Sequence, residues 1–98
     1  MDLATFKQSL DRDAPPEGLG RALAALWHAA KGDWDEAHHL AQAQKDAVGA
    51  WVHAYLHRVE GDLSNAGYWY RRAGTPPSTA PLEQEWDEIA DALLGDRG

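Results

Sequence analysis

Apolar and polar residues follow one another along the chain with the spacing of α-helices. Between the glycine and proline breaks, apolar residues recur every three to four positions and so share one face of a helix. No stretch of strand length shows alternation at every second residue. The pattern predicts an all-α chain of five to six helices, at about residues 2–11, 16–31, 33–45, 47–60, 62–73 and 80–94.

The breaks between these segments indicate how the helices are connected. Pro15-Pro16 and Pro76-Pro77 mark two long breaks, whereas Gly32-Asp33 and Gly61-Asp62 mark two short ones. A glycine can end a helix with a positive φ, and the aspartate after it can cap the next helix. Because a break of one or two residues forces its two helices to run antiparallel, we expect two helix hairpins.

Apolar stripes on the predicted helices give the candidate core. The strongest stripe is on the helix expected at 47–60 and consists of Val48, Trp51, Val52, Tyr55, Leu56 and Val59. We expect Leu63 and Leu82 to begin the inward stripes of the two helices that follow. Trp27, Trp34 and Trp86 also fall on inward stripes.

The two predicted hairpins resemble each other when the sequence is shifted by 29 residues. Residues 19–37 then align with residues 48–66, and the apolar stripes coincide. The identical pairs are Ala25/Ala54, His28/His57, Gly32/Gly61, Asp33/Asp62 and Ala37/Ala66. This pattern predicts an internal repeat, with one copy at about 19–45, a second at about 48–73 and a capping helix at about 80–94.

The repeated motif is Gly-Asp, then an apolar residue, two further residues and alanine, with a small residue seven positions before the glycine. This pattern resembles the tetratricopeptide repeat and its Sel-like relatives over residues 19–73. The resemblance implies antiparallel hairpins in a right-handed α-α superhelix, a single helical-repeat domain over residues 1–98 and a surface for protein partners. Residues 52–74 also resemble small uncharacterised bacterial proteins, which implies no activity.

Length and composition narrow the class of protein. Ninety-eight residues make one domain with a modest core. The lack of cysteine excludes disulfides, thiolate metal ligands and a cysteine nucleophile. The first residues show no secretory signal, and no apolar run reaches the length of a membrane span. We therefore expect a cytoplasmic protein that does not bind membranes.

The charge balance argues against nucleic-acid binding. Nine Lys and Arg residues stand against 16 Asp and Glu residues, which gives a net charge of −7. The only adjacent basic pair is Arg71-Arg72, whereas phosphate contacts come from clustered basic residues. The acidic run at residues 83–91, which includes Glu83 and Glu85, is typical of a solvated helix face.

Two histidines and a glutamate form the first candidate site. His53, His57 and Glu60 are spaced so that they share a helix face away from the centre of the apolar stripe. Side chains at this spacing can reach one metal ion, although histidine pairs also fill helix–helix seams or lie on wet surfaces. His38 and His39 point about 100° apart on their helix, so they form no pair.

Residues 68–72 form the second candidate site. Tyr68, Arg71 and Arg72 are candidate ligand-binding residues, because aromatics with arginine are common in binding hot spots and arginine can bind a carboxylate or phosphate. In the alternative interpretation, Trp69 packs against Trp86 under the last helix, and the arginines pair with acidic residues. These acidic partners would be Glu83 or Asp87.

The sequence shows no catalytic residues and predicts no cofactor. It has no nucleophile-elbow motif and no glycine-rich phosphate loop, which argues against an enzyme. Our first hypothesis is a non-enzymatic helical-repeat module that binds a protein partner or forms a homodimer. The alternative hypothesis is a small-molecule or metal-binding protein, with enzyme activity left open, that uses His53, His57, Glu60, Tyr68 and Arg72.

Overall fold

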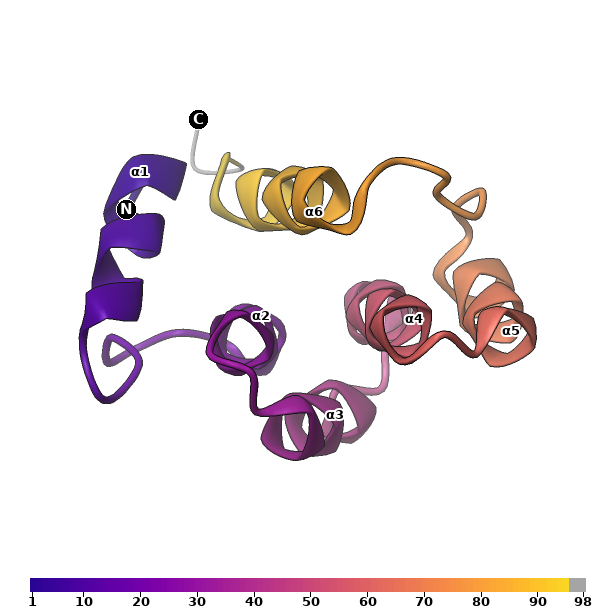
Figure 1. The fold of residues 1–98 in the computed structure, drawn as a ribbon, viewed down its shortest axis with the longest axis horizontal. Helices are drawn as coiled ribbons and strands as arrows, with labels where there is room; N and C mark the ends of the chain where they lie inside the picture. Colours follow the sequence, from indigo (N-terminus) through magenta and orange to yellow (C-terminus); the bar gives the residue numbers. More distant parts are fainter. Residues whose placement is uncertain (96–98) are drawn as a thin grey trace.

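The computed structural model describes residues 1–95, and within that range every regular element is helical. Six α-helices and one short 3₁₀ helix follow each other along the chain (Figure 1). Their bounds are α1 Leu3–Gln8, η1 Ser9–Asp11, α2 Arg21–Ala30, α3 Trp34–Ala43, α4 Ala47–Glu60, α5 Leu63–Ala73 and α6 Leu82–Gly95. The predicted all-α class is confirmed, and residues 96–98 of the predicted domain lie outside the described residues.

The longer helices are arranged around α4. α4 packs against α5, α3, α2 and α6, while α2 also packs against α3 (Figure 1). α1 lies at the opposite end from α5 and contacts α6. Among the described helices, none is long and apolar enough to cross a membrane.

The predicted start of the second helix at residue 16 is wrong, because α2 begins at Arg21. Gly18 has a φ of +85°, and Gly20, the N-cap, is extended, so the chain between Pro16 and Arg21 is not helical. Gln44 reaches back from the α3–α4 loop and accepts the backbone N–H of Ala22 at 3.0 Å. A distant side chain therefore satisfies this helix terminus, which local sequence cannot reveal.

The two short turns between paired helices have the same geometry. In each turn a glycine has a φ of +83° or +86°, and the next aspartate donates its backbone N–H to a histidine carbonyl 2.9 Å away. The residues are Gly32, Asp33 and His28 in the first turn and Gly61, Asp62 and His57 in the second. This is a Schellman-type helix end, so the histidine backbone has a structural part in both turns.

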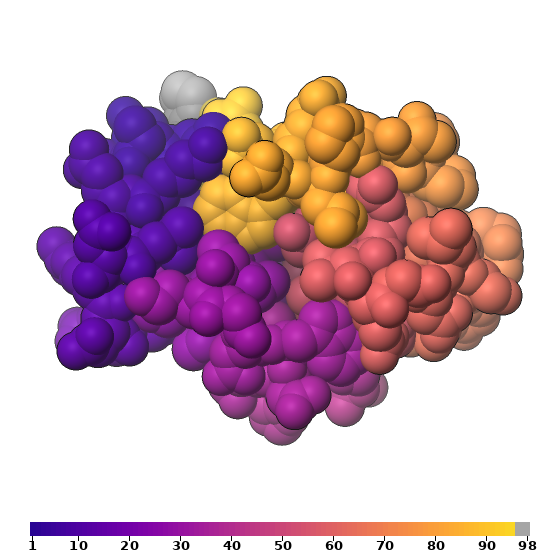
Figure 2. Space-filling view, in the orientation of Figure 1, coloured from indigo at the N-terminus to yellow at the C-terminus, as the bar shows by residue number. Residues whose placement is uncertain are grey.

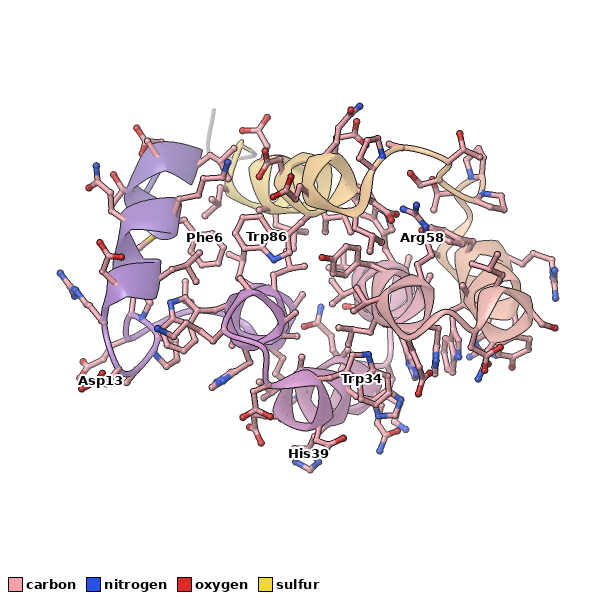
Figure 3. All side chains as sticks on the ribbon, viewed as in Figure 1. Phe6, Asp13, Trp34, His39, Arg58 and Trp86 are labelled. Carbon is pink, nitrogen blue, oxygen red and sulfur yellow. The ribbon has the colours of Figure 1, made fainter. Side chains whose placement is uncertain are left out.

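The main core lies between α1, α2, α3, α4 and α6. Trp86 stacks on Phe6 with ring centroids 5.6 Å apart, and its Nε1 donates to the Leu26 carbonyl at 2.8 Å (Figure 3). Trp27 is also buried and donates its Nε1 to Ser9 Oγ at 3.2 Å. Both tryptophans have a polar partner for the indole N–H, which allows their burial.

Three residues that we expected to face inward are exposed. They are Val59, Leu63 and Leu82, and Leu63 keeps 68% of its surface in contact with solvent. Each lies in the first or last turn of its helix, where neighbouring helices no longer cover the stripe. The prediction of burial from helical periodicity is therefore wrong for these residues at helix ends.

Candidate metal site between helices α3, α4 and α5

Helices α3 and α4 bring three histidine rings together. The ring centroids are 4.6 Å apart for His38 and His53, 4.9 Å for His53 and His57, and 5.5 Å for His38 and His57. One ring nitrogen from each residue lies within 4.8 Å of the other two. We call His38, His53 and His57 the histidine cluster.

The packing of α3 on α4 explains this convergence. His53 and His57 are one turn apart on α4 and are only 4% and 7% exposed. His38 comes from α3, so the residue pattern of α4 alone does not predict it. The side chains of Asp33 and Asp46 cap the two helices, accepting the backbone N–H groups of Glu36 and Gly49, and so set where each helix begins.

Two tryptophans hold the cluster in place. Trp34 stacks on His38 with centroids 4.7 Å apart, and its Nε1 donates to the Leu56 carbonyl at 2.8 Å. Trp69, from α5, stacks on His53 with centroids 3.8 Å apart. The expected contact between Trp69 and Trp86 is therefore wrong, because α5 turns this indole toward the histidines.

Tyr68 and Arg72 lie beside Trp69. The Arg72 guanidinium lies 5.4 Å from the Trp69 ring centroid, and its Nη1 donates to Tyr68 Oη at 3.3 Å. Arg71 is exposed, and within residues 1–95 neither it nor Arg72 forms an ion pair. The alternative interpretation, in which the arginines pair with Glu83 or Asp87, is therefore wrong. Asp87 pairs with Lys7 at 2.9 Å, and Glu83 forms no ion pair within residues 1–95.

Glu60 contacts the cluster through His57. Its Oε1 lies 2.9 Å from His57 Nδ1. Because a carboxylate oxygen only accepts hydrogen bonds, Nδ1 carries a hydrogen, and Nε2 of a neutral ring keeps its lone pair. This is the arrangement in which a carboxylate orients a metal-binding histidine.

The surroundings of the other two rings, His38 and His53, favour the uncharged form. Burial, and then the charges of neighbouring histidines, lower the pKa of His53 to about 4. Burial also lowers the pKa of His38. Neither ring has a hydrogen-bond partner within residues 1–95. In the same range, every side-chain nitrogen that is fully enclosed by protein does have a hydrogen-bond partner. The unpartnered nitrogens of these two rings therefore reach accessible space.

A cavity of about 420 Å³ provides that space beside His53. Ala50 and His53 of α4, Trp69 and Arg72 of α5, and Lys45 of the α3–α4 loop line it. Of the histidine cluster, His53 is the member that lines this cavity.

The donor set suits a transition-metal ion. Zinc–nitrogen bonds of about 2.0–2.1 Å place tetrahedral ligand nitrogens about 3.4 Å apart, so the ring nitrogens of the cluster, which lie within 4.8 Å of one another, would have to move closer together to bind one ion. Imidazole nitrogens suit zinc, copper and nickel better than magnesium or calcium. His57, Glu60 and Asp62 also lie close together, but both carboxylates are exposed and already accept hydrogen bonds.

Neither the sequence nor the fold matches any protein-family model, curated protein or solved structure.

Proposed function

We propose that this protein binds one divalent transition-metal ion, with zinc as the reference ion, through His38, His53 and His57. The observation that supports the proposal is the convergence of three ring nitrogens within 4.8 Å of one another. Two of these rings have no hydrogen-bond partner within residues 1–95, so their lone pairs are available to a metal.

The residues around the ligands have supporting roles in this proposal. Glu60 orients His57 through its Nδ1, while Trp34 and Trp69 hold the planes of His38 and His53. Three protein ligands leave at least one coordination position for water or another molecule, and the cavity beside His53 gives access to it.

The first hypothesis from the sequence, a tetratricopeptide-like module for a protein partner or a homodimer, stays a prediction. Exposed apolar residues such as Leu63 and Tyr68 are compatible with it, but they carry no specific contact that identifies a partner. Tyr68, Arg71 and Arg72 stay predicted ligand-binding residues, and of these Arg72 lines the cavity beside His53.

The test is a zinc titration of untagged protein by calorimetry, with His38→Ala as the decisive variant. We expect one zinc ion per chain, and we expect His38→Ala to weaken binding by at least about 100-fold, more than the loss of an orienting residue. At a free zinc concentration of 100 Kd, the metal should stabilise the wild-type fold by about 2.7 kcal/mol.

His39→Ala is the matched control, since His39 is the next residue on α3, is exposed and points away from the cluster (Figure 3). It should bind zinc like the wild-type protein. Circular dichroism of both variants checks that they fold. Equal loss in the two variants, or no zinc binding by the wild-type protein, would refute the proposal.

A further inference from the structure

A second cavity, of about 470 Å³, lies away from the histidine cluster where α1, α2, α4 and α6 meet. We call it the α6 cavity. Figure 2 shows the indigo N-terminal segment, the magenta α2 and the yellow α6 meeting on one face of the molecule. Its volume is in the range of sites that hold small organic molecules.

The walls of the α6 cavity are apolar and aromatic. Leu10, Ala30, Tyr55 and Trp86 line it. Trp86 is fixed by its stacking on Phe6 and by the hydrogen bond from its Nε1 to the Leu26 carbonyl (Figure 3). A rigid aromatic wall of this kind loses little conformational entropy when a ligand packs against it.

The Tyr55 hydroxyl is the first sign that this cavity takes a ligand. Tyr55 is only 7% exposed, yet within residues 1–95 its hydroxyl has no hydrogen-bond partner. Every fully enclosed side-chain oxygen in the same range does have one, so the Tyr55 hydroxyl reaches the cavity. Buried phenols normally find a partner, and here a ligand can supply it.

The charged residues that line the cavity indicate the sign of the charge that a ligand would carry. Glu83 and Asp87 of α6 line the cavity together with Lys7 of α1. The Asp87 carboxylate pairs with Lys7 at 2.9 Å, whereas Glu83 has no ion-pair partner within residues 1–95. Among the residues that line the cavity, the Glu83 carboxylate therefore leaves one unbalanced negative charge beside aromatic walls, while the nearby Lys31 ammonium donates to the Leu10 carbonyl at 2.7 Å.

We propose that the α6 cavity binds an organic ammonium ion. The apolar part of the ligand packs against Trp86 and Leu10. Its ammonium group faces the aromatic rings and the Glu83 carboxylate, and donates a hydrogen bond to Tyr55 Oη. Aromatic faces and a carboxylate together recognise organic cations, because the ring quadrupole and the negative charge both attract them.

Calorimetric titration with 2-phenylethylammonium chloride tests this proposal, with 3-phenylpropanoate as the probe of opposite charge. We expect the ammonium ion to bind at least about tenfold more tightly than the carboxylate. Glu83→Gln should weaken ammonium binding by roughly threefold, as expected for one exposed charge pair. Glu88→Gln removes an exposed carboxylate of the same helix outside the cavity, and should have no effect.

Two further variants place the binding in this cavity. Ala30→Phe fills the cavity from an exposed position of α2 and should abolish binding, while Tyr55→Phe removes only the hydroxyl and should weaken it severalfold. His38→Ala should bind the ammonium ion normally, because the histidine cluster is a separate site. Equal binding of the two probes, or unchanged binding in Glu83→Gln or Ala30→Phe, would overturn the proposal.

Discussion

Helix α4 contributes to two polar clusters, one toward α6 and one toward α3 (Figure 3). Toward α6, Arg58 donates to Glu85 at 2.6 Å and to the Ala80 carbonyl at 2.7 Å. The hydroxyl of Tyr70 donates to the second oxygen of Glu85 at 2.5 Å, and that glutamate is only 1% exposed. We call Arg58, Tyr70 and Glu85 the matched cluster.

The difference between the two clusters shows which one is available for binding. In the matched cluster each charge has an opposite charge or a hydrogen-bond partner, so the fold itself accounts for these residues. In the histidine cluster, the rings of His38 and His53 pack against other rings, but within residues 1–95 their nitrogens have no hydrogen-bond partner. The matched cluster joins α6 to α4 and α5, whereas the histidine cluster offers ligand atoms.

Removing the carboxylate of the matched cluster has the largest expected effect. Glu85→Ala leaves the Arg58 guanidinium and the Tyr70 hydroxyl without their acceptor, which should lower the free energy of unfolding by about 3–5 kcal/mol. Urea denaturation measures this loss. Glu88→Ala, at an exposed position of the same helix, is the control and should change it by less than about 0.5 kcal/mol.

A substitution in the histidine cluster provides the counterpart to that experiment. In metal-free protein, His38→Phe keeps a ring against Trp34 and breaks no side-chain hydrogen bond within residues 1–95, so we expect a change below about 1 kcal/mol. The same variant should lose zinc binding. A loss of stability as large as that of Glu85→Ala would show that both clusters serve the fold.

The next largest effect is expected at Glu60. Glu60→Gln keeps an oxygen that can accept from His57 Nδ1 but removes the charge, so zinc affinity should fall by about 10–100-fold. The stability of the metal-free protein should change little, because the Glu60 side chain is 45% exposed. Calorimetry measures the affinity. The control is Glu36→Gln, which changes an exposed glutamate on α3. Equal affinity in wild type and Glu60→Gln would mean that Glu60 does not orient the ligand.

The sequence predicts part of the histidine cluster and misses the rest. The spacing of His53 and His57 places them on one face of α4, because helical periodicity is a local property. His38 lies at the edge of the inward stripe of α3, beside Ala37, and only the rotation of α3 against α4 decides that it joins them. A pattern within one helix does not contain that rotation.

Glu85 shows the same limit on the α6 side. In sequence it is one of several acids in a run typical of a solvated face, yet it is the acid that is buried and paired. Its partners Arg58 and Tyr70 lie 27 and 15 positions away along the chain. Local composition therefore predicts the helix and its charge, whereas the pairing depends on how α6 crosses α4 and α5.

Alkaline pH gives the smallest effect, and of the two clusters it acts on the matched cluster. Burial, and then the hydrogen bond to the Glu85 carboxylate, raise the pKa of Tyr70 well above its ordinary value of 10, while Arg58 partly opposes this. The unfolded chain releases the Tyr70 proton first, so stability falls as pH rises above 10. The contribution of Tyr70 should be about 1 kcal/mol by pH 11. It is measured by urea denaturation between pH 9 and 11, as the stability that wild type loses beyond the loss of Tyr70→Phe.

His38→Phe should lose as much stability as wild type over this pH range, because it leaves the matched cluster intact. If Tyr70→Phe instead falls in parallel with wild type, the Tyr70 hydroxyl is not held by Glu85, and the contrast between the two sides of α4 weakens.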